Sequence, residues 1–211
     1  MNNELEQYIA AHISPEPDML AQLYRHTYLH RLYPRMCSGH VQGRMLKMLT
    51  RMIAPQRILE LGTFTGYSAL CMAEGMPESA HIHTIEIEDE WEDEIRSLFL
   101  ASPWGDRMHL HIGDAIDIVP QIDEKWDLVF IDANKRHYLD YYHMLLPLLN
   151  PSGYIIADNT LWDGKVTATP TPADTQTQGI LEFNDFVAKD PRVEVSILPI
   201  RDGMTIINLK N

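Results

Sequence analysis

The sequence predicts an α/β fold in which a doubly wound, mostly parallel sheet of seven strands follows a group of N-terminal helices. From residue 57 onward, short apolar runs typical of strands alternate with runs that have helical spacing, as in parallel sheets joined by crossover helices. The last two strand-like runs, 193–198 and 204–209, are separated by only five residues. Because a crossover connection needs about a dozen residues, this pair is predicted to be an antiparallel hairpin with one strand reversed.

The segment before the sheet is predicted to be helical. Between Glu4 and about Ala54, apolar residues recur at helical spacing, and Pro15, Pro17 and Pro34 interrupt the pattern. These residues predict two or three helices.

Strands and helices then alternate along the core. The predicted strands are residues 57–61, 81–87, 107–112, 126–132, 153–158, 193–198 and 204–209. The predicted helices are a segment from about residue 66 and residues 89–101, 115–120, 136–149 and 177–189. The stretch 165–178, rich in Thr, Pro and Ala, is predicted to be a long connection, and such connections in compact domains are usually functional or mobile.

The size and composition of the chain limit what it can be. With 211 residues it is expected to form one domain over 1–211, with helices in 1–54 and a Rossmann-like core in 55–211. Its 17 basic and 30 acidic residues give a formal charge of −13, which disfavours bulk binding to nucleic acid or anionic membranes. A local basic patch in the first third of the chain remains open.

The two cysteines and the N-terminal residues indicate the cellular compartment. Cys37 and Cys71 have no metal-site or redox-pair spacing and are expected to be buried free thiols. Residues 1–11 lack the basic start and apolar centre of a signal peptide, and no apolar run approaches the length of a membrane span. We therefore expect a cytoplasmic protein with no membrane partner.

A glycine-containing turn closes the first predicted strand. Glu60 lies two residues before Gly62, and Gly66 opens the next helix, where a ligand can approach the backbone closely. The spacing is not that of dinucleotide-binding turns, and a carboxylate at Glu60 would repel a pyrophosphate and attract a cation. Glu86, on the next strand, is placed to accept hydrogen bonds from ribose hydroxyls. These carboxylates favour a nucleoside with a positive centre, so S-adenosylmethionine fits better than NAD.

Two apolar runs end in carboxylates. One runs into Asp132, Asn134 and Lys135, and the other runs into Asp158 and Asn159. If the two runs are neighbouring parallel strands, their carboxyl ends meet at one crevice. Oxygen ligands select a hard divalent cation, Mg²⁺ first and Ca²⁺ or Mn²⁺ as alternatives, and so few protein ligands leave coordination positions open. The sequence therefore predicts a cation site with a lysine beside it.

Several motifs together resemble one family. They are the segments 60–68 (Glu-Leu-Gly-Thr-Phe-Thr-Gly-Tyr-Ser), 130–135 (Phe-Ile-Asp-Ala-Asn-Lys) with Tyr138, 158–166 (Asp-Asn-Thr-Leu-Trp-Asp-Gly-Lys-Val), 183–184 and 198–203. With these motifs the chain resembles the cation-dependent O-methyltransferases that include catechol and caffeoyl-CoA O-methyltransferases. The resemblance extends over nearly the whole chain beyond residue 33 and implies the Rossmann-like fold of class I methyltransferases.

The resemblance also implies roles for individual residues. Asp132, Asp158 and Asn159 would hold the metal, and Lys135 would take the hydroxyl proton as the catalytic base. The residues implied to bind S-adenosylmethionine are Met36, Ser38, Glu60, Gly62, Thr63, Ser68, Glu86, Asp114, Ala115 and Asp132. Among them Glu86 would hold the ribose and Asp114 would contact the adenine. The segment 36–43 follows the family pattern only partly, since the family usually has an acidic residue near Val41.

Other aromatic and histidine residues have a functional and a structural interpretation. Trp162 is predicted either to bind an aromatic substrate as a wall of the site or to pack under its loop. His137 could assist proton removal, but a solvent-facing histidine at a helix start is the favoured interpretation. The pairs 81/83 and 109/111 could bind a transition metal, although structural histidines at strand ends are favoured.

Taken together, these features predict an S-adenosylmethionine- and metal-dependent O-methyltransferase that acts on a small catechol-like aromatic. A phenolic hydroxyl has a pKa of about 10 in water, and a bound divalent cation lowers such a pKa. The alternative within the family is a transfer RNA 5-hydroxyuridine O-methyltransferase. A catalytically silent S-adenosylmethionine-binding protein and a dinucleotide dehydrogenase are further alternatives, and the resemblance implies a homodimer.

Overall fold

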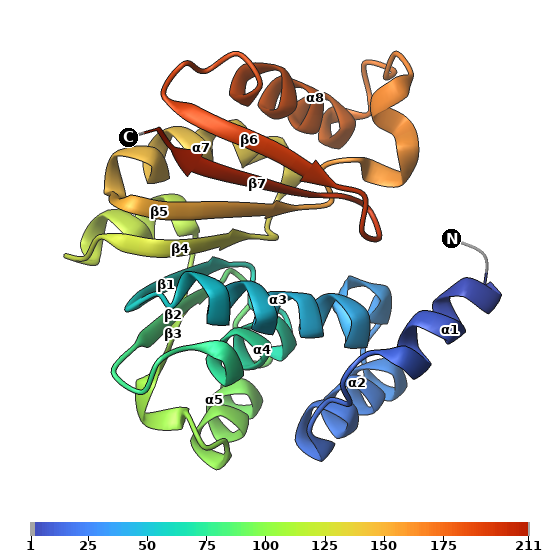
Figure 1. The fold of residues 1–211 in the computed structure, drawn as a ribbon, viewed down its shortest axis with the longest axis vertical. Helices are drawn as coiled ribbons and strands as arrows, with labels where there is room; N and C mark the ends of the chain where they lie inside the picture. Colours follow the sequence, from blue (N-terminus) through green and yellow to red (C-terminus); the bar gives the residue numbers. More distant parts are fainter. Residues whose placement is uncertain (1–2, 211) are drawn as a thin grey trace.

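Seven strands form one sheet in the order β3-β2-β1-β4-β5-β7-β6 (Figure 1). The computed structural model describes residues 3–210, so residues 1, 2 and 211 of the predicted domain lie outside the described part. The strands are β1 (Arg57–Leu61), β2 (His81–Glu86), β3 (Met108–Ile112), β4 (Trp126–Ile131), β5 (Leu149–Asp158), β6 (Val193–Leu198) and β7 (Met204–Leu209). β7 runs antiparallel to both of its neighbours, and the other pairings are parallel. The predicted fold class is confirmed.

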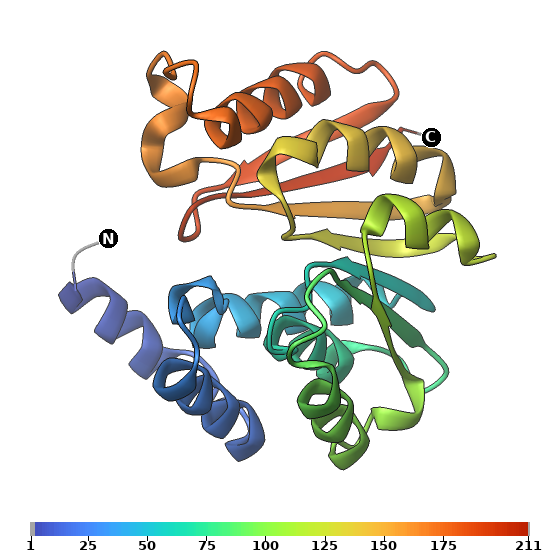
Figure 2. The same cartoon turned by 180° about the vertical axis from the view of Figure 1, so that it is seen from behind.

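Helices cover both faces of the sheet. The α-helices are α1 (Asn3–His12), α2 (Asp18–His30), α3 (Gly39–Ile53), α4 (Tyr67–Gly75), α5 (Glu92–Ala101), α6 (Ala115–Ile118), α7 (Tyr138–Leu145) and α8 (Thr175–Val187). α2 to α5 pack on one face and α6 to α8 on the other (Figures 1 and 2). None of the helices within residues 3–210 is long and apolar enough to cross a membrane.

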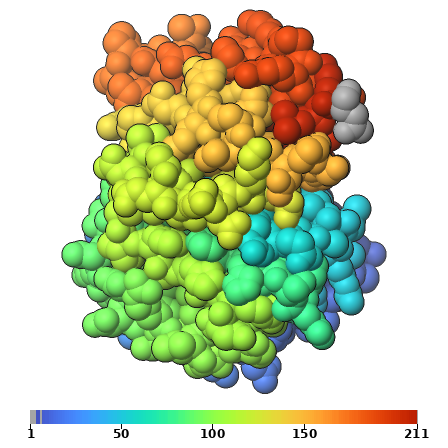
Figure 3. All heavy atoms as spheres, turned by 90° about the vertical axis from the view of Figure 1, so that its left-hand side faces the viewer, coloured from blue at the N-terminus to red at the C-terminus, as the bar shows by residue number. Residues whose placement is uncertain are grey.

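The central strands explain why the sheet is a buried core. In β4, Leu128 and Phe130 face the layer of α3 to α5, whereas Val129 and Ile131 face the layer of α7 and α8, and all four are fully buried. Strands covered on both faces are continuously apolar instead of alternating with polar residues. The edges of the sheet are β3 and β6, and Figure 3 shows the C-terminal segments in orange and red at one end of the molecule and green segments at the other.

Several predicted boundaries are wrong for local reasons. β5 begins at Leu149, before the predicted residue 153, because Leu149 pairs with Trp126 ahead of a shift in register. α8 begins at Thr175, since the Asp174 carboxylate accepts a hydrogen bond from the backbone N–H of Thr177 and caps the helix. The predicted long connection is therefore shorter, and a 3₁₀ segment, η6 (Trp162–Thr167), occupies its start.

Short 3₁₀ turns replace the ends of two predicted helices. The predicted helix 136–149 consists of η4 (Lys135–His137), α7 and η5 (Leu146–Leu148). The predicted helix 115–120 is α6 followed by η3 (Val119–Gln121). η3 and η5 each contain a proline, which cannot continue the hydrogen-bond pattern of an α-helix. Two further 3₁₀ turns are η1 (Pro34–Met36) and η2 (Gly105–Arg107).

Candidate active site

A cavity of about 910 Å³ lies at the carboxyl ends of β1, β2, β4 and β5. This is the edge at which open α/β sheets bind ligands. The structure brings thirteen of the predicted site residues to its wall: Met36, Ser38, Gly62, Thr63, Ser68, Glu86, Asp114, Ala115, Asp132, Lys135, Asp158, Asn159 and Trp162. The predicted cofactor and acceptor sides therefore share one cavity, while the individual roles remain predictions.

The turn after β1 requires glycine at position 62. The backbone N–H of Asp132 donates to the carbonyl of Leu61 at 2.9 Å, which brings the ends of β1 and β4 together. A Cβ on Gly62 would lie 2.2 Å from the carbonyl oxygen of Asp132, and the φ of Gly62 is +96°. Only glycine allows this close approach without displacing the backbone.

Glu60 is the predicted cofactor residue that does not line the cavity. Its side chain is fully buried beneath the wall, where Oε2 accepts a hydrogen bond from the hydroxyl of Thr84 and Oε1 has no hydrogen-bond partner among residues 3–210. Burial raises the pKa of Glu60 to about 8, although the nearby hydroxyls of Ser68 and Thr84 oppose the rise. In this position Glu60 supports the turn from below, and it does not present a carboxylate at the cavity surface.

Glu86 is held at the floor of the cavity by two backbone groups. Its carboxylate accepts from the N–H of Phe64 at 2.6 Å and from the N–H of Glu88 at 3.0 Å. An ionised carboxylate has about four acceptor positions, so Glu86 retains capacity for the two hydroxyls of a ribose. Farther along the wall, Asp114 caps α6 by accepting from the N–H of Ile116 at 2.9 Å.

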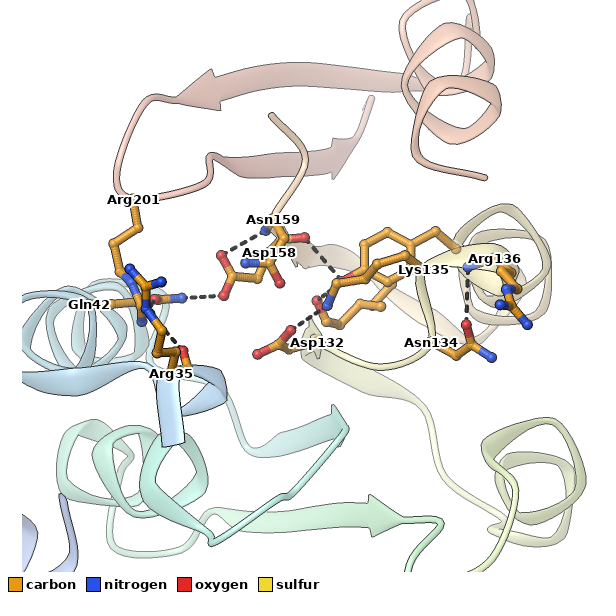
Figure 4. A network of polar contacts seen from close by, with 11 residues as sticks. Arg35, Gln42, Asp132, Asn134, Lys135, Arg136, Asp158, Asn159 and Arg201 are labelled. Atoms are coloured by element: carbon orange, nitrogen blue, oxygen red, sulfur yellow. Dashed lines mark hydrogen bonds and ion pairs between the residues drawn. The ribbon is translucent and has the colours of Figure 1, made fainter. Parts of the chain in front are cut away.

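Asp158 and Asn159 end β5 on the acceptor side (Figure 4). Asp158 is only 2% exposed, and its Oδ2 accepts from Gln42 Nε2 at 2.6 Å while Oδ1 accepts from the N–H of Asn159 at 2.8 Å. Burial and the negative charge of Asp132 raise the pKa of Asp158. Asn159 has a φ of 58°, a left-handed conformation that asparagine adopts more readily than most residues.

The oxygen atoms of Asp132, Asp158 and Asn159 fit a hard divalent cation. Two carboxylates and one carboxamide provide the ligand chemistry that Mg²⁺ prefers. The carboxylates of Asp132 and Asp158 lie close enough for the charge of Asp132 to contribute to the raised pKa of Asp158. Within residues 3–210, no group of three or more His, Cys, Asp or Glu side chains could hold a metal. The set of Asp132, Asp158 and Asn159 is not a group of that kind, because its third member is a carboxamide.

Lys135 lies beside this set on η4. Its side chain is largely buried, with Nζ 2.6 Å from Asp132 Oδ1, 5.2 Å from the ring centroid of Tyr138 and 5.9 Å from that of Trp162. The hydroxyl of Tyr138 donates to the carbonyls of Ile131 and Asp158, so it joins the ends of β4 and β5 directly under the lysine. An amine held between a carboxylate and two aromatic rings is well placed to exchange a proton with a ligand in the cavity.

Comparisons with known proteins identify the family. The sequence profile of the O-methyltransferase family matches residues 9–210. Caffeoyl-CoA O-methyltransferase 1 of Eucalyptus globulus is 32% identical over 201 residues, which cover 90% of this chain and 81% of that protein. Caffeoyl-CoA O-methyltransferase 1 of Arabidopsis thaliana is 31% identical over an alignment of 218 positions, which covers 97% of this chain and 84% of that protein. The chain belongs to the O-methyltransferase family.

Solved structures agree with this membership. The O-methyltransferase TomG of Streptomyces achromogenes, solved with S-adenosylmethionine, has a TM-score of 0.91 at 27% identity over 99% of this chain and 97% of its own. The methyltransferase PaMTH1 of Podospora anserina, solved with S-adenosylhomocysteine, has a TM-score of 0.91 at 30% identity over 100% of this chain and 97% of its own. The predicted family, fold and enzyme class are confirmed.

Two residues of this O-methyltransferase that we did not predict belong to the site. Gln42 binds the carboxylate of Asp158, and Arg201 binds Gln42 (Figure 4). Arg201 lies in the 198–203 motif and Gln42 lies in the 36–43 segment, so both residues belong to segments that the sequence analysis had related to the family pattern. Their partners are 116 and 159 residues away along the chain, and only the folded structure shows them.

The structure shows the surroundings of the aromatic residue, histidine and cysteines that the sequence singled out. Trp162 both lines the cavity and packs against the core under its loop. His137 is exposed, lies outside the cavity wall and bonds to Asp140 at 3.0 Å, as a surface histidine would. Cys37 and Cys71 are buried free thiols, as predicted.

The four strand histidines of this O-methyltransferase bond in pairs across β2 and β3. His81 lies 3.0 Å from His109 and His83 lies 3.0 Å from His111, measured between ring nitrogens. Burial lowers the pKa of His83 to about 3 and also lowers the pKa of His109 and of His111. The four rings form a partly buried ladder on the sheet, which agrees with the structural interpretation.

Proposed function

We propose that this O-methyltransferase transfers the methyl group of S-adenosylmethionine to a hydroxyl of a small catechol-like aromatic, with a divalent cation at Asp132, Asp158 and Asn159. The observation that carries the proposal is the single cavity that contains both this oxygen set and the predicted cofactor residues. TomG and PaMTH1, which share the fold, were solved with S-adenosylmethionine and S-adenosylhomocysteine. Mg²⁺ is the cation we expect, with Ca²⁺ and Mn²⁺ as alternatives.

Each half of the cavity has its own task. On the cofactor side, Glu86 would accept the ribose hydroxyls, and Gly62 would let the cofactor approach the backbone at the start of α4. When bound, the cation would act as a Lewis acid and lower the pKa of the acceptor hydroxyl. On the acceptor side, Lys135 would take the hydroxyl proton at Nζ, and the indole of Trp162 would orient an aromatic ring.

Methyl transfer also depends on the alignment of the two substrates. Methyl transfer requires the acceptor oxygen and the sulfonium methyl to lie in line, and holding two substrates in one geometry supplies a large part of the rate enhancement. The rigid strand ends, joined by Tyr138 and by the close approach at Gly62, hold the two sides of the cavity at a fixed separation. The residues of the cavity are therefore expected to act mainly by orientation and proton transfer.

The transfer RNA alternative rests on the charge at the mouth of the cavity. Arg35 and Arg136 line the cavity with exposed side chains, although the whole chain has a charge of −13. Cations there could contact the phosphates of an RNA loop. Because the acidic surface as a whole would repel RNA, the small aromatic acceptor is favoured.

One assay separates these proposals. The purified protein, stripped of metal by a chelator and dialysed, is incubated with methyl-labelled S-adenosylmethionine and either catechols or transfer RNA that lacks the modification. We expect label in the catechol only after Mg²⁺ is added back. Label in transfer RNA but not in catechols would contradict the proposed acceptor. Full activity of the metal-free enzyme would contradict the proposed metal dependence.

A further inference from the structure

A chain of hydrogen bonds joins the β6–β7 loop to the buried carboxylate of Asp158 (Figure 4). Arg201, in the loop, donates from Nη1 to Gln42 Oε1 at 2.8 Å. Gln42, on α3, donates from Nε2 to Asp158 Oδ2 at 2.6 Å and is only 1% exposed. A surface arginine is thus connected through one buried amide to a predicted metal ligand.

The chemistry of the three groups permits only one orientation of the amide. A guanidinium has donors only, an ionised carboxylate has acceptors only, and a carboxamide has one of each at its two ends. The Gln42 oxygen must therefore face Arg201, and its nitrogen must face Asp158. The carboxylate favours this orientation by accepting from the amide nitrogen, and Arg201 adds to the preference by donating to the amide oxygen, so a turned amide would lose both hydrogen bonds. Arg201 therefore helps to fix Gln42, and Gln42 fixes one oxygen of Asp158.

The other carboxylate oxygen of Asp158 is also held by a hydrogen bond. Its Oδ1 accepts from the backbone N–H of Asn159, as described above. Each carboxylate oxygen has two lone pairs, so both retain one for a cation. Hydrogen bonds of this kind orient ligating carboxylates, and their loss typically lowers metal affinity by about 10- to 100-fold.

The same guanidinium also holds one wall of the cofactor side. Arg201 donates to the backbone carbonyls of Arg35, Cys37 and Ser38. These residues line the cavity and precede α3, the helix that carries Gln42. One side chain therefore contacts the segment 35–38 on the cofactor side and the amide on the acceptor side.

We propose that Gln42 and Arg201 are positioning residues: Gln42 fixes Asp158 for the divalent cation, and Arg201 fixes both the Gln42 amide and the 35–38 wall of the cofactor side. This inference rests on the proposed function, because it assigns the cation to Asp158. The inference assigns the two residues different effects on ligand binding. Loss of Gln42 should weaken the cation alone, whereas loss of Arg201 should weaken both the cation and S-adenosylmethionine.

The test measures binding to the full-length protein without any acceptor. Mn²⁺ binding is followed by the electron paramagnetic resonance signal of the free ion, and S-adenosylmethionine binding is followed by calorimetry. We expect Gln42→Met, which keeps the side-chain volume, to raise the Kd for Mn²⁺ about 10- to 100-fold and to leave the Kd for S-adenosylmethionine within about twofold. Arg201→Met should raise both dissociation constants.

A matched control is available at a remote site. Arg107 also donates to two loop carbonyls, those of Pro77 and Glu78, but it lies outside the cavity wall. Arg107→Met should lower thermal stability and leave both dissociation constants unchanged. If Gln42→Met does not fold, as judged by circular dichroism, Arg201→Met carries the test, because Arg201 is exposed and its loss opens no core cavity.

The outcomes distinguish this inference from the proposed function. Wild-type protein that binds Mn²⁺ through Asp158, together with a Gln42→Met variant of unchanged Mn²⁺ affinity, would overturn the positioning role and leave the function intact. Unchanged Mn²⁺ affinity in Arg201→Met would do the same for Arg201. Wild-type protein whose Mn²⁺ binding is absent, or survives Asp158→Ala, would overturn both.

Discussion

Lys135 is the residue on which the proposed proton transfer depends. Its amine lies against Asp132 and between the rings of Tyr138 and Trp162, and η4 holds it within the cavity wall. The lysine does not reach the cofactor residues on β1 and β2 by any hydrogen bond within residues 3–210. Its contribution should therefore appear in turnover and not in cofactor binding.

Replacing this lysine tests its role directly. Lys135→Met removes the amine and retains most of the side-chain volume. General bases typically contribute about 10²- to 10⁴-fold to a rate, so we expect kcat to fall by a factor in that range while the Kd for S-adenosylmethionine changes little. Stopped-time assays and calorimetry give the two quantities. Near-normal turnover across pH 6 to 9 would remove Lys135 from the mechanism.

Gly62 controls the geometry between β1 and β4. In Gly62→Ala the new methyl group would meet the carbonyl of Asp132, so we expect a loss of about 3 kcal/mol of stability and weaker binding of S-adenosylmethionine. Gly164→Ala is the matched control, because Gly164 has a φ of +75° with nothing within 4 Å of its Cβ position. It should cost only the left-handed strain, about 1 kcal/mol. Equal losses in urea unfolding would show that the close approach is unimportant.

At the scale of elements, the sequence determines strands better than turns and caps. The predicted bounds of β1, β6 and β7 are correct. Turn residues delimit them, with Gly62 after β1 and Pro199 and Gly203 between β6 and β7. The start of β5 was missed because residues 150–153, Asn-Pro-Ser-Gly, have the composition of a turn. The start of α8 was missed because the capping role of Asp174 depends on a contact that periodicity does not report.

The histidine ladder on β2 and β3 predicts a loss of stability in acid. The pKa of His83 is lowered to about 3 in the folded protein, whereas the pKa of a histidine in an unfolded chain is about 6.5. Between these values the unfolded state binds more protons, so stability falls as the pH falls. We expect His83→Gln to lose less stability than wild type between pH 7.5 and pH 5 in urea unfolding. If both proteins lost the same free energy of unfolding between pH 7.5 and pH 5, His83 would not contribute to the acid sensitivity.

For the molecule as a whole, topology brings the site together. The sequence placed Asp132, Asp158 and Asn159 at strand ends, and the β1-β4-β5 order then made them neighbours. Sequence reasoning located the cavity and most of its wall, but it put Glu60 at the surface of the site and missed Gln42 and Arg201. Burial depth and contacts between distant segments decide those three cases, and neither can be read from spacing.

Assembly is a second property of the whole molecule. Large apolar side chains are exposed on and near the N-terminal helices, including Leu29 and Met52, and the exposed Leu32 and Tyr33 also line the cavity. Exposed apolar surface often marks protein–protein contacts, and we expect a homodimer. Light scattering coupled to size-exclusion chromatography should give twice the mass of 24.3 kDa. A mass of one chain at micromolar concentration would contradict the expectation.

If Asp132, Asp158 and Asn159 hold a divalent cation beside the methyl donor, turnover must depend on that cation. Chelator-treated wild-type protein and Asp158→Ala are titrated with Mg²⁺ in a catechol methylation assay, with S-adenosylmethionine binding measured in parallel. We expect Mg²⁺ to restore turnover only to the wild type, and we expect both proteins to bind S-adenosylmethionine. Full turnover of the wild type without metal, or Mg²⁺ stimulation that persists in Asp158→Ala, would contradict this expectation.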